Sequence, residues 1–300
     1  MGASSLQRAA TKGGLVLLYH SVFESLPKPL DGTIHNTTPE TLRRQLEAVG
    51  REFTFVSVDE LAVMKNPTGF AAVSFDDGYR CVLEEGLAVF ESLQIPFTLY
   101  LNGGTFNGRP NWRDKVRTLE SASLVEEFEG CMQGIHKIPG KRFYRYSKSP
   151  QNNSKAVDLE LDRFLAKKGI AFPLLDYMLN DPRELPDHPL VQYGNHSQHH
   201  YVMSSLGYEE ILDEVRQTKC LLDELPQSRI SQWFSVPFGE VRDFNSQTTQ
   251  AVRTLGYKGC LLSRRRLHRA AIEVHGLAAL ERYMPRDTKT GDVWQGLGEV

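Results

Sequence analysis

The chain has 300 residues, of which 40% are hydrophobic and 24% charged, and its formal net charge is −2. Such a composition is typical of a globular protein with one large core or two smaller ones, and it argues against disorder. Because the net charge is close to zero and the basic residues are scattered, the chain offers no basic surface for a phosphate backbone. Nucleic acid is therefore not an expected partner.

The amino end lacks a segment that is long and apolar enough for a secretion signal or a membrane span. Its first apolar run covers residues 15–19 and ends at His20, which is too short for either. The four cysteines are far apart and show no Cys-x-x-Cys spacing, which favours reduced thiols over a zinc knuckle or a redox pair. They are Cys81, Cys131, Cys220 and Cys260. We therefore expect a cytoplasmic protein without an integral membrane segment.

In the first hundred residues, short apolar runs alternate with helical patterns. Thr38 followed by Pro39 predicts a helix start, Asp59 is expected to cap a brief helix through residue 64, and residues 82–93 read as a third helix. The apolar residues expected to face inward are Leu42, Leu46 and Val49 in the first helix and Leu83, Leu87 and Phe90 in the third. The predicted strands are 15–19, 53–58, 71–75 and 95–101.

The alternation stops between about residues 105 and 189 and then returns. We interpret 105–189 as a helical insertion, with helices over 154–168 and 173–179, inside a single domain that spans 1–300. After it, helices are expected over 208–225 and 245–255, and strands over 190–194, 232–236, 257–262 and 277–283. Repeated strand–helix units predict an α/β fold with a largely parallel sheet or barrel.

Polar residues follow several of these predicted strands directly. They are His20, the pair Asp76–Asp77, His196 and the Pro237–Phe238 turn. Because the carboxyl ends of parallel strands gather at one rim, we expect these residues to converge although they are remote in sequence.

The acid pair and the two histidines predict a catalytic metal site. Two adjacent carboxylates at the end of a buried strand repel each other, and burial opposes their ionisation, so a cation is expected beside them. One carboxylate with two imidazoles, His196 and His200, is a common ligand set for zinc. If Asp77 completes that set, Asp76 is left to accept a proton from water, and hydrolysis of an amide or ester follows. Alone, the acid pair also fits a turn, and the histidines also fit surface or core positions, with His199 a bystander.

Several motifs resemble those of one family. Residues 74–78, Ser-Phe-Asp-Asp-Gly, and 196–200, His-Ser-Gln-His-His, resemble the first two motifs of the polysaccharide deacetylases, the NodB homology domain or carbohydrate esterase family 4. Residues 232–239 resemble the third motif. Leu-Leu-Tyr-His at 17–20 and Asn-Thr-Thr-Pro-Glu at 36–40 resemble the opening of the branch found with surface polysaccharide biosynthesis.

The resemblance implies a distorted (β/α) barrel with fewer than eight regular strands and a metal-dependent active site. Asp76 would be the base, and Asp77, His196 and His200 would bind a divalent metal, Zn²⁺ first, with Co²⁺, Ni²⁺, Mn²⁺ or Fe²⁺ as alternatives. The backbone N–H of Phe238 would donate to the oxyanion of the tetrahedral intermediate.

Two departures from the family pattern stand out. Ser235 replaces the arginine of the third motif, so the cation that orients the base must be absent or come from elsewhere. The late Leu-x-His motif, which supplies the general acid, has no clean match. His268, His275 and His20 are candidates, of which we retain His275 as the acid. Trp112 either stacks on a sugar or, the more common case, anchors the insertion.

The resemblance implies a hydrolase that removes an N-acetyl group, or less commonly an O-acetyl or N-formyl group, from a sugar. A cytoplasmic location would favour a lipid-linked glycan or O-antigen precursor, with peripheral contact to lipid, over a finished surface polysaccharide. The alternatives are a catalytically silent glycan-binding barrel, suggested by Ser235 and by the missing Leu-x-His motif, and a metal amidase that acts on a small molecule.

Overall fold

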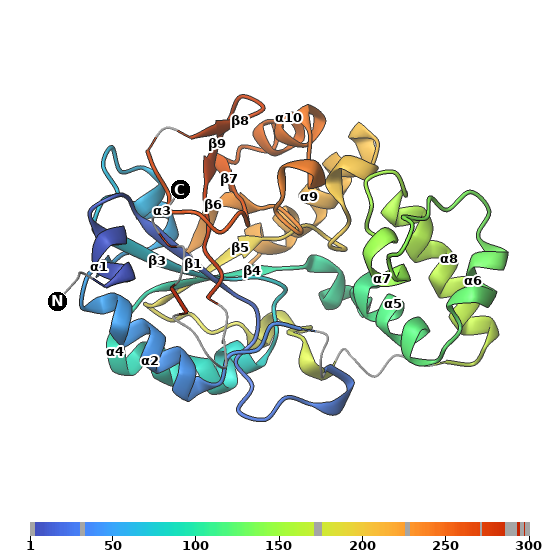
Figure 1. Ribbon diagram of the computed structural model, residues 1–300, viewed down its shortest axis with the longest axis horizontal. Coiled ribbons are helices and arrows are strands. Elements are labelled where there is room, and N and C mark those ends of the chain that lie inside the picture. The colour runs from blue at the N-terminus through green and yellow to red at the C-terminus, as the bar shows by residue number, and fades with distance from the viewer. Residues whose placement is uncertain are drawn as a thin grey trace.

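A computed structural model describes residues 4–30, 34–170, 176–225, 229–270, 272–285, 293–294 and 297. Its centre is a curled sheet in the order β1-β3-β4-β5-β6-β7-β9-β8, with β2 beside β3 (Figure 1). All pairings are parallel except that of β8 with β9. The strands are β1 Leu15–Tyr19, β2 Thr54–Phe55, β3 Phe70–Phe75, β4 Phe97–Leu101, β5 Val191–Asn195, β6 Ile230–Ser235, β7 Gly259–Leu261, β8 Glu273–Val274 and β9 Leu277–Leu280.

The sheet curls until the chain beyond β9 meets β1. Leu18 N–H donates to the Tyr283 carbonyl at 2.9 Å, and Tyr283 N–H donates to the Val16 carbonyl at 2.8 Å. Both hydrogen bonds flank a parallel bridge between Leu17 and Tyr283. The predicted distorted (β/α) barrel is confirmed, and the carboxyl ends of its parallel strands share one rim.

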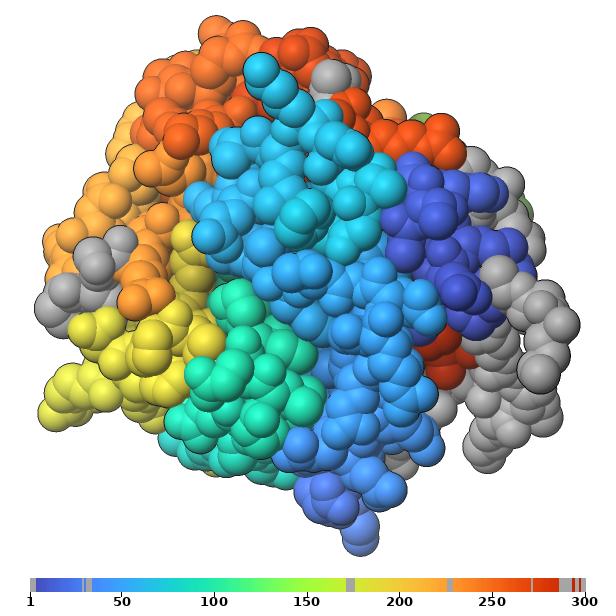
Figure 2. All heavy atoms as spheres, turned by 90° about the vertical axis from the view of Figure 1, so that its left-hand side faces the viewer, coloured from blue at the N-terminus to red at the C-terminus, as the bar shows by residue number. Residues whose placement is uncertain are grey.

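Helices cover the outside of the sheet, and their sequences explain where they begin. α2 starts at Pro39 because Thr38 accepts a hydrogen bond from the Thr41 N–H, and its predicted inward face, Leu42, Leu46 and Val49, is fully buried. On the face in Figure 2, the blue and cyan N-terminal third lies beside the yellow and orange later units. The covering helices are α1 Ser5–Ala10, α2 Pro39–Gly50, α3 Val58–Ala62, α4 Leu87–Leu93, α9 Tyr208–Asp223 and α10 Ser246–Thr254.

Between β4 and β5 the chain forms a helical lobe on one side of the barrel, green in Figure 1. Its helices are α5 Trp112–Ser121, α6 Val125–Cys131, α7 Phe143–Tyr146 and α8 Ser154–Lys167. The buried rings of Trp112, Phe128 and Phe143 belong to one apolar cluster with Val202 and Ile211 of the barrel. The lobe therefore shares a core with the barrel.

Two local predictions were wrong. Asp59 does not cap α3: the Ser57 hydroxyl accepts from the Glu60 N–H at 3.2 Å, and the Glu60 carboxylate accepts from the Ser57 N–H at 2.8 Å. Asp59 instead accepts hydrogen bonds from Ser231 and Gln232 and so ties α3 to β6. The strand expected over 53–58 is only β2, because this capping box starts the helix early.

The helix expected over 82–93 is not one regular α-helix. A π-helical turn, Val82–Gly86, precedes α4. Of the residues expected to face inward, Phe90 is fully buried, and Leu83 and Leu87 are partly buried and pack against the same core as Val82 and Val89. Of the helix expected over 173–179, residues 173–175 lie outside the described residues. In the described part of the chain, no helix is long and apolar enough to cross a membrane.

Candidate metal centre and cleft

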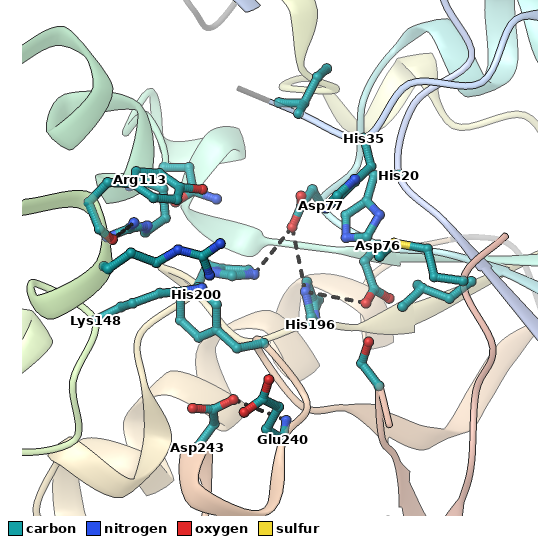
Figure 3. Close-up of a pocket in the computed structure, with 18 of the residues that line it drawn as sticks. His20, His35, Asp76, Asp77, Arg113, Lys148, His196, His200, Glu240 and Asp243 are labelled. Carbon is teal, nitrogen blue, oxygen red and sulfur yellow. Dashed lines mark hydrogen bonds and ion pairs between the residues drawn. The ribbon is translucent and has the colours of Figure 1, made fainter. Parts of the chain in front are cut away.

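The predicted polar residues meet beyond the carboxyl ends of the strands. Asp76 and Asp77 follow β3, His196 follows β5, and His20 follows β1. They line a cleft of about 670 Å³ between the barrel rim and the helical lobe. Figure 3 shows their side chains pointing toward one another, and the helical lobe lies across the cleft from His20 and Asp76. The strand order therefore brings together residues that are remote in the sequence, such as His20 and His196.

Asp77, His196 and His200 have the geometry of a metal-ligand set. The Asp77 Oδ1 atom lies 3.3 Å from His200 Nε2 and 3.5 Å from His196 Nε2, and the three ligand atoms lie within 4.8 Å of one another. Asp77 Oδ1 is buried and accepts no hydrogen bond among the described residues. An oxygen left unpartnered between two imidazole nitrogens fits a bound divalent cation.

The two histidines are fixed by different contacts. His196 Nδ1 lies 2.9 Å from the Ser235 carbonyl, which makes this nitrogen the donor and turns Nε2 toward Asp77. The His200 N–H donates to the Ser197 hydroxyl at 3.0 Å, and the Trp112 indole donates to the His200 carbonyl at 2.8 Å. The loop that carries both imidazoles is thus held by β6 on one side and by the lobe on the other.

Backbone strain gathers at this centre. Asp77, Ser197, His200 and Phe238 all have positive φ, between 58° and 74°. Outside glycine such a conformation costs about 1–3 kcal/mol and persists only where surrounding contacts impose it. Asn102 supplies one such contact, because its amide donates to the His196 carbonyl at 2.5 Å and to the Ser197 carbonyl at 3.2 Å. Three of these residues, Asp77, His200 and Phe238, line the cleft, and strain concentrated there is typical of a functional site.

Asp76 is bound by an arginine from the other end of the chain. The Arg282 guanidinium donates both Nη1 and Nη2 to the two Asp76 oxygens, each at 2.8 Å, and both side chains are buried. The Ser235 hydroxyl also donates to Asp76 Oδ1 at 2.9 Å. Burial alone would raise the pKa of Asp76, but Arg282 and His196 outweigh it and lower the pKa to about 2. Asp76 is therefore a fixed carboxylate.

The two histidines differ in pKa. Burial lowers the pKa of His200 to about 3, although Asp77 opposes this change. Burial also acts to lower the pKa of His196, but the charges of Asp76 and Asp77 reverse the effect and raise it. His200 is consequently neutral near pH 7 and offers a lone pair on Nε2.

The structure does not bring every candidate to the cleft. His275 lies in the turn before β9, whereas the cluster lies beyond the carboxyl ends of the strands, and it is absent from the described residues that line the cleft. His268 pairs through its backbone with Gly14, before β1. His199 lies 2.6 Å from Glu214 and does not join the trio. Of the three candidates for the general acid, only His20 lines the cleft.

Trp112 is an anchor. Its ring is fully buried in the core that the lobe shares with the barrel, so it has no face free to stack on a sugar. The anchoring interpretation is confirmed, and sugar stacking by this residue is excluded.

Sequence reasoning missed Arg282. The last strand was expected to run through residue 283, so Arg282 was not recognised as a strand-end residue, whereas β9 ends at Leu280. Position alone could have found it, since the cluster residues all follow strand ends. Arg113 and Lys148 in the lobe were also missed because their segment matches no motif, yet both line the cleft.

Comparisons with known proteins give the same fold. A family model described as polysaccharide deacetylase matches residues 179–260, a stretch that includes His196 and His200. The structure of IcaB from Ammonifex degensii superposes with a TM-score of 0.54 at 16% identity, covering 94% of each chain. Streptococcus pyogenes deacetylase PplD, in complex with acetate, gives 0.53 at 14% identity over 91% of this chain and 92% of that one. A de-N-acetylase from Aggregatibacter actinomycetemcomitans gives 0.53 at 12% identity, over 93% and 97%.

A sequence search of curated proteins finds no match. At identities of 12–16% the structural similarity shows the fold alone. The predicted family resemblance is confirmed by the family model together with that fold.

Proposed function

We propose that this chain, which has the fold of the polysaccharide deacetylases and matches their family model, is a metal-dependent hydrolase. Its substrate would be an N-acetylated sugar of a surface polysaccharide, an O-antigen or a lipid-linked glycan precursor. One observation carries the proposal: the Asp77 Oδ1 atom lies without a hydrogen-bond partner between the imidazoles of His196 and His200. Beside this trio, Arg282 holds Asp76 ionised.

Asp77, His196 and His200 would hold the metal, with Zn²⁺ as the first choice. When bound, such a dication supplies Lewis-acid polarisation of an amide carbonyl and lowers the pKa of water. Asp76 would accept the proton of the attacking water. Its Oδ1 atom already accepts from Ser235 and Arg282, whereas Oδ2 accepts only from Arg282 and keeps a lone pair for this proton.

Two further residues would complete the reaction. Phe238 lies in the turn after β6 with its ring 4.6 Å from the His200 ring, and its N–H makes no hydrogen bond among the described residues, so it is free to donate to the oxyanion. His20 replaces His275 as our candidate for the general acid, because it lines the cleft and its Nδ1 atom is buried without a hydrogen-bond partner in the described part of the chain. It would protonate the leaving amine.

A silent glycan-binding barrel was suggested by two departures, Ser235 in place of an arginine and the missing Leu-x-His motif. On the first point Arg282 supplies the cation that Asp76 needs, and Ser235 adds a hydrogen bond, which favours an active enzyme. A cytoplasmic location stays a proposal. The four free cysteines favour it, and it would make a lipid-linked precursor the substrate, reached by peripheral contact with the lipid.

The test is acetate release from N-acetylated oligosaccharides by protein loaded with Zn²⁺ or Co²⁺, with chelator-treated protein and a simple amide as references. We expect Asp76→Asn to lower kcat by about 10²–10⁴, the usual contribution of a general base. Asp223→Asn, an exposed change on α9, serves as the matched control. Equal turnover by wild type and Asp76→Asn would exclude the mechanism, and faster turnover of the simple amide would favour a small-molecule amidase.

A further inference from the structure

The side of the cleft formed by the helical lobe is positively charged. We call the cleft-lining residues between Asn111 and Pro150 the lobe wall. It carries five cationic side chains, Arg113, Arg117, Lys141, Arg145 and Lys148, and no carboxylate among its described residues. Arg117 is neutralised by an ion pair with Asp114. For the other four, the described part of the chain offers no carboxylate within 4.0 Å.

Arg113 is the most unusual of these four. Its side chain is only 2% exposed, and a buried guanidinium normally pairs with a carboxylate. Here Nη1 and Nη2 donate to the Ser147 hydroxyl and the Tyr144 carbonyl, which are neutral, and Nε is buried without a partner. The Trp112 and Tyr144 rings lie 4.6 and 4.1 Å from its charge centre and stabilise it only in part. Within the described protein its positive charge is therefore balanced only from a distance, by Asp114 and Glu120, and not by a carboxylate in contact with it.

Lys148 adds a second such charge beside the metal-ligand trio. Its ammonium lies 4.7 Å from the centre of the Phe238 ring, and that ring packs against His200. In Figure 3, Arg113 and Lys148 lie on the lobe side of His200, opposite His20 and Asp76. Lys148 is partly exposed in the cleft, so its ammonium can contact a ligand directly.

The carboxylates of the cleft do not fully balance this charge. Asp76 is engaged by Arg282, and Asp77 belongs to the metal-ligand trio. Arg242 pairs with both Glu240 and Asp243. Asp243 also acts on the charge of Lys148, but its carboxylate oxygens are more than 4.0 Å from that ammonium. A buried cation and a partly buried cation thus lie on one wall of an open cleft, where an anionic ligand can reach them.

We propose that the lobe wall binds an oxyanion of the substrate, so that the sugar to be deacetylated belongs to an acidic glycan. The group is the carboxylate of a uronic acid or a phosphate. Both present negatively charged oxygens that accept hydrogen bonds from Lys and Arg. Lys148 contacts the oxyanion directly, and the buried Arg113 attracts it electrostatically without contact. The substrate class rests on the proposed deacetylase function, whereas anion binding does not.

Two experiments test the proposal. The first compares kcat/KM for acetate release from three matched oligosaccharides, in which N-acetylglucosamine is linked to glucose, to glucuronate or to a phosphorylated sugar. We expect a preference of about tenfold or more for one charged substrate over the neutral one, as a charge-assisted hydrogen bond gives. Lys148→Ala should remove this preference, measured as the ratio of the kcat/KM values for the charged and the neutral substrate, whereas Lys167→Ala, an exposed charge removal on α8, should keep it. Which charged substrate is preferred distinguishes carboxylate from phosphate.

The second experiment needs no turnover. Binding of glucuronate and of inorganic phosphate is measured by calorimetry on the full chain, with and without chelator, because a bound metal also attracts anions. Lys148→Ala and Arg113→Gln should each weaken binding about tenfold or more, whereas Lys167→Ala, an exposed charge removal on α8, should not. Because Arg113 is buried, the folding of Arg113→Gln is checked by circular dichroism. If Arg113→Gln unfolds, Lys148→Ala still tests the proposal.

The two ideas fail separately. Anion binding that depends on Lys148, without acetate release from any oligosaccharide, would overturn the deacetylase proposal and keep the anion site. Acetate release that is equal for neutral and charged substrates, and unchanged in Lys148→Ala, would overturn the anion site and keep the deacetylase.

Discussion

Arg282 does for Asp76 what the family's third motif would otherwise do, and it does so from the opposite end of the chain. The guanidinium and carboxylate form a bidentate, fully buried pair. The folded-state pKa of Asp76 is lowered to about 2, so the stability from this pair is present above the ordinary pKa of an aspartate, about 3.9. That stability is lost as the pH falls from there through about 2.

Replacing Arg282 should therefore change both the pH profile and the rate. Arg282 is the first of the groups that oppose the effect of burial on Asp76, so in Arg282→Gln the pKa of Asp76 should rise and the acid limb of kcat/KM should move to higher pH. The maximal rate should fall about 10²-fold as the base loses its orientation. Arg264→Gln, which removes the neighbouring arginine's pair with Glu281, is the control. An acid limb that stays in place in Arg282→Gln would show that Arg282 does not tune Asp76.

Lys148 gives a prediction in the alkaline range. Burial, followed by the charge of Arg113, lowers the pKa of Lys148 to about 8; Arg145 acts in the same direction, and Tyr144 and Asp243 oppose it. In the free enzyme the ammonium is charged below that pH and neutral above it. The preference for an acidic over a neutral substrate, measured as the ratio of kcat/KM values, should therefore decline as the pH rises through about 8. Lys148→Arg should keep the preference to higher pH, and a parallel decline in that variant would contradict the assignment.

At this scale the sequence predicted the site residues that lie in a recognisable motif after a strand and missed those outside any motif, Arg282 among them. Asp76, Asp77, His196 and His200 converge because each strand end is marked by an apolar run. His275 was chosen by its late position in the chain, whereas the structure offers His20, which precedes the acid pair. A motif search takes residues in the order of the chain, whereas residues on a barrel rim are neighbours in space whatever their order in the sequence.

Among the elements, a buried polar contact attaches the lobe to the loop after β5, which carries His196 and His200. Asp158 of α8 pairs with Lys115 of α5 at 2.6 Å and accepts from the Tyr201 hydroxyl at 2.6 Å. Lys115 and Asp158 are both 1% exposed. Tyr201 directly follows His200, so this contact links two lobe helices to the loop that carries the imidazoles.

Asp158→Asn should thus destabilise the protein strongly. It leaves the Lys115 ammonium with only the partly exposed Asp162 as a carboxylate partner. Losing one member of a buried pair costs about 3–5 kcal/mol of unfolding free energy, which urea denaturation measures. Asp162→Asn is the matched control and should cost much less, because that carboxylate is partly exposed. Equal losses in the two variants would mean that Asp158 is not the principal partner.

Element boundaries show why the fold was easier to predict than its details. The α2 start was predictable because Thr38 and Pro39 act locally. The π-helical turn at Val82–Gly86 was not, since its residues have ordinary helical preferences and no local sequence signal marks the change in hydrogen bonding. The lobe helices α5 and α6 were missed because part of the apolar core against which they pack is formed by side chains of the barrel, which are remote in the sequence.

Over the whole molecule, alternation of strands and helices predicted the barrel, but its closure depends on Tyr283 beside Leu17, a pairing of residues at opposite ends of the chain. That closure also brings Arg282 under the rim. The cleft then combines groups from both termini and from the lobe, so its ligand affinity should be coupled to global stability.

Metal binding should report this coupling. A ligand that binds only the folded chain stabilises it by RT ln(1 + [L]/Kd), about 2.7 kcal/mol at a hundredfold excess over Kd. Adding Zn²⁺ to chelator-treated protein should therefore raise the melting temperature in a concentration-dependent way. Asp77→Asn should abolish most of the rise, because it removes the only carboxylate of the trio. Asp243→Asn, a change in the same cleft outside the trio, should preserve it. An equal rise in wild type and Asp77→Asn would mean that zinc binds elsewhere, and the metal centre would then have to be abandoned while the barrel and its charged cleft remain.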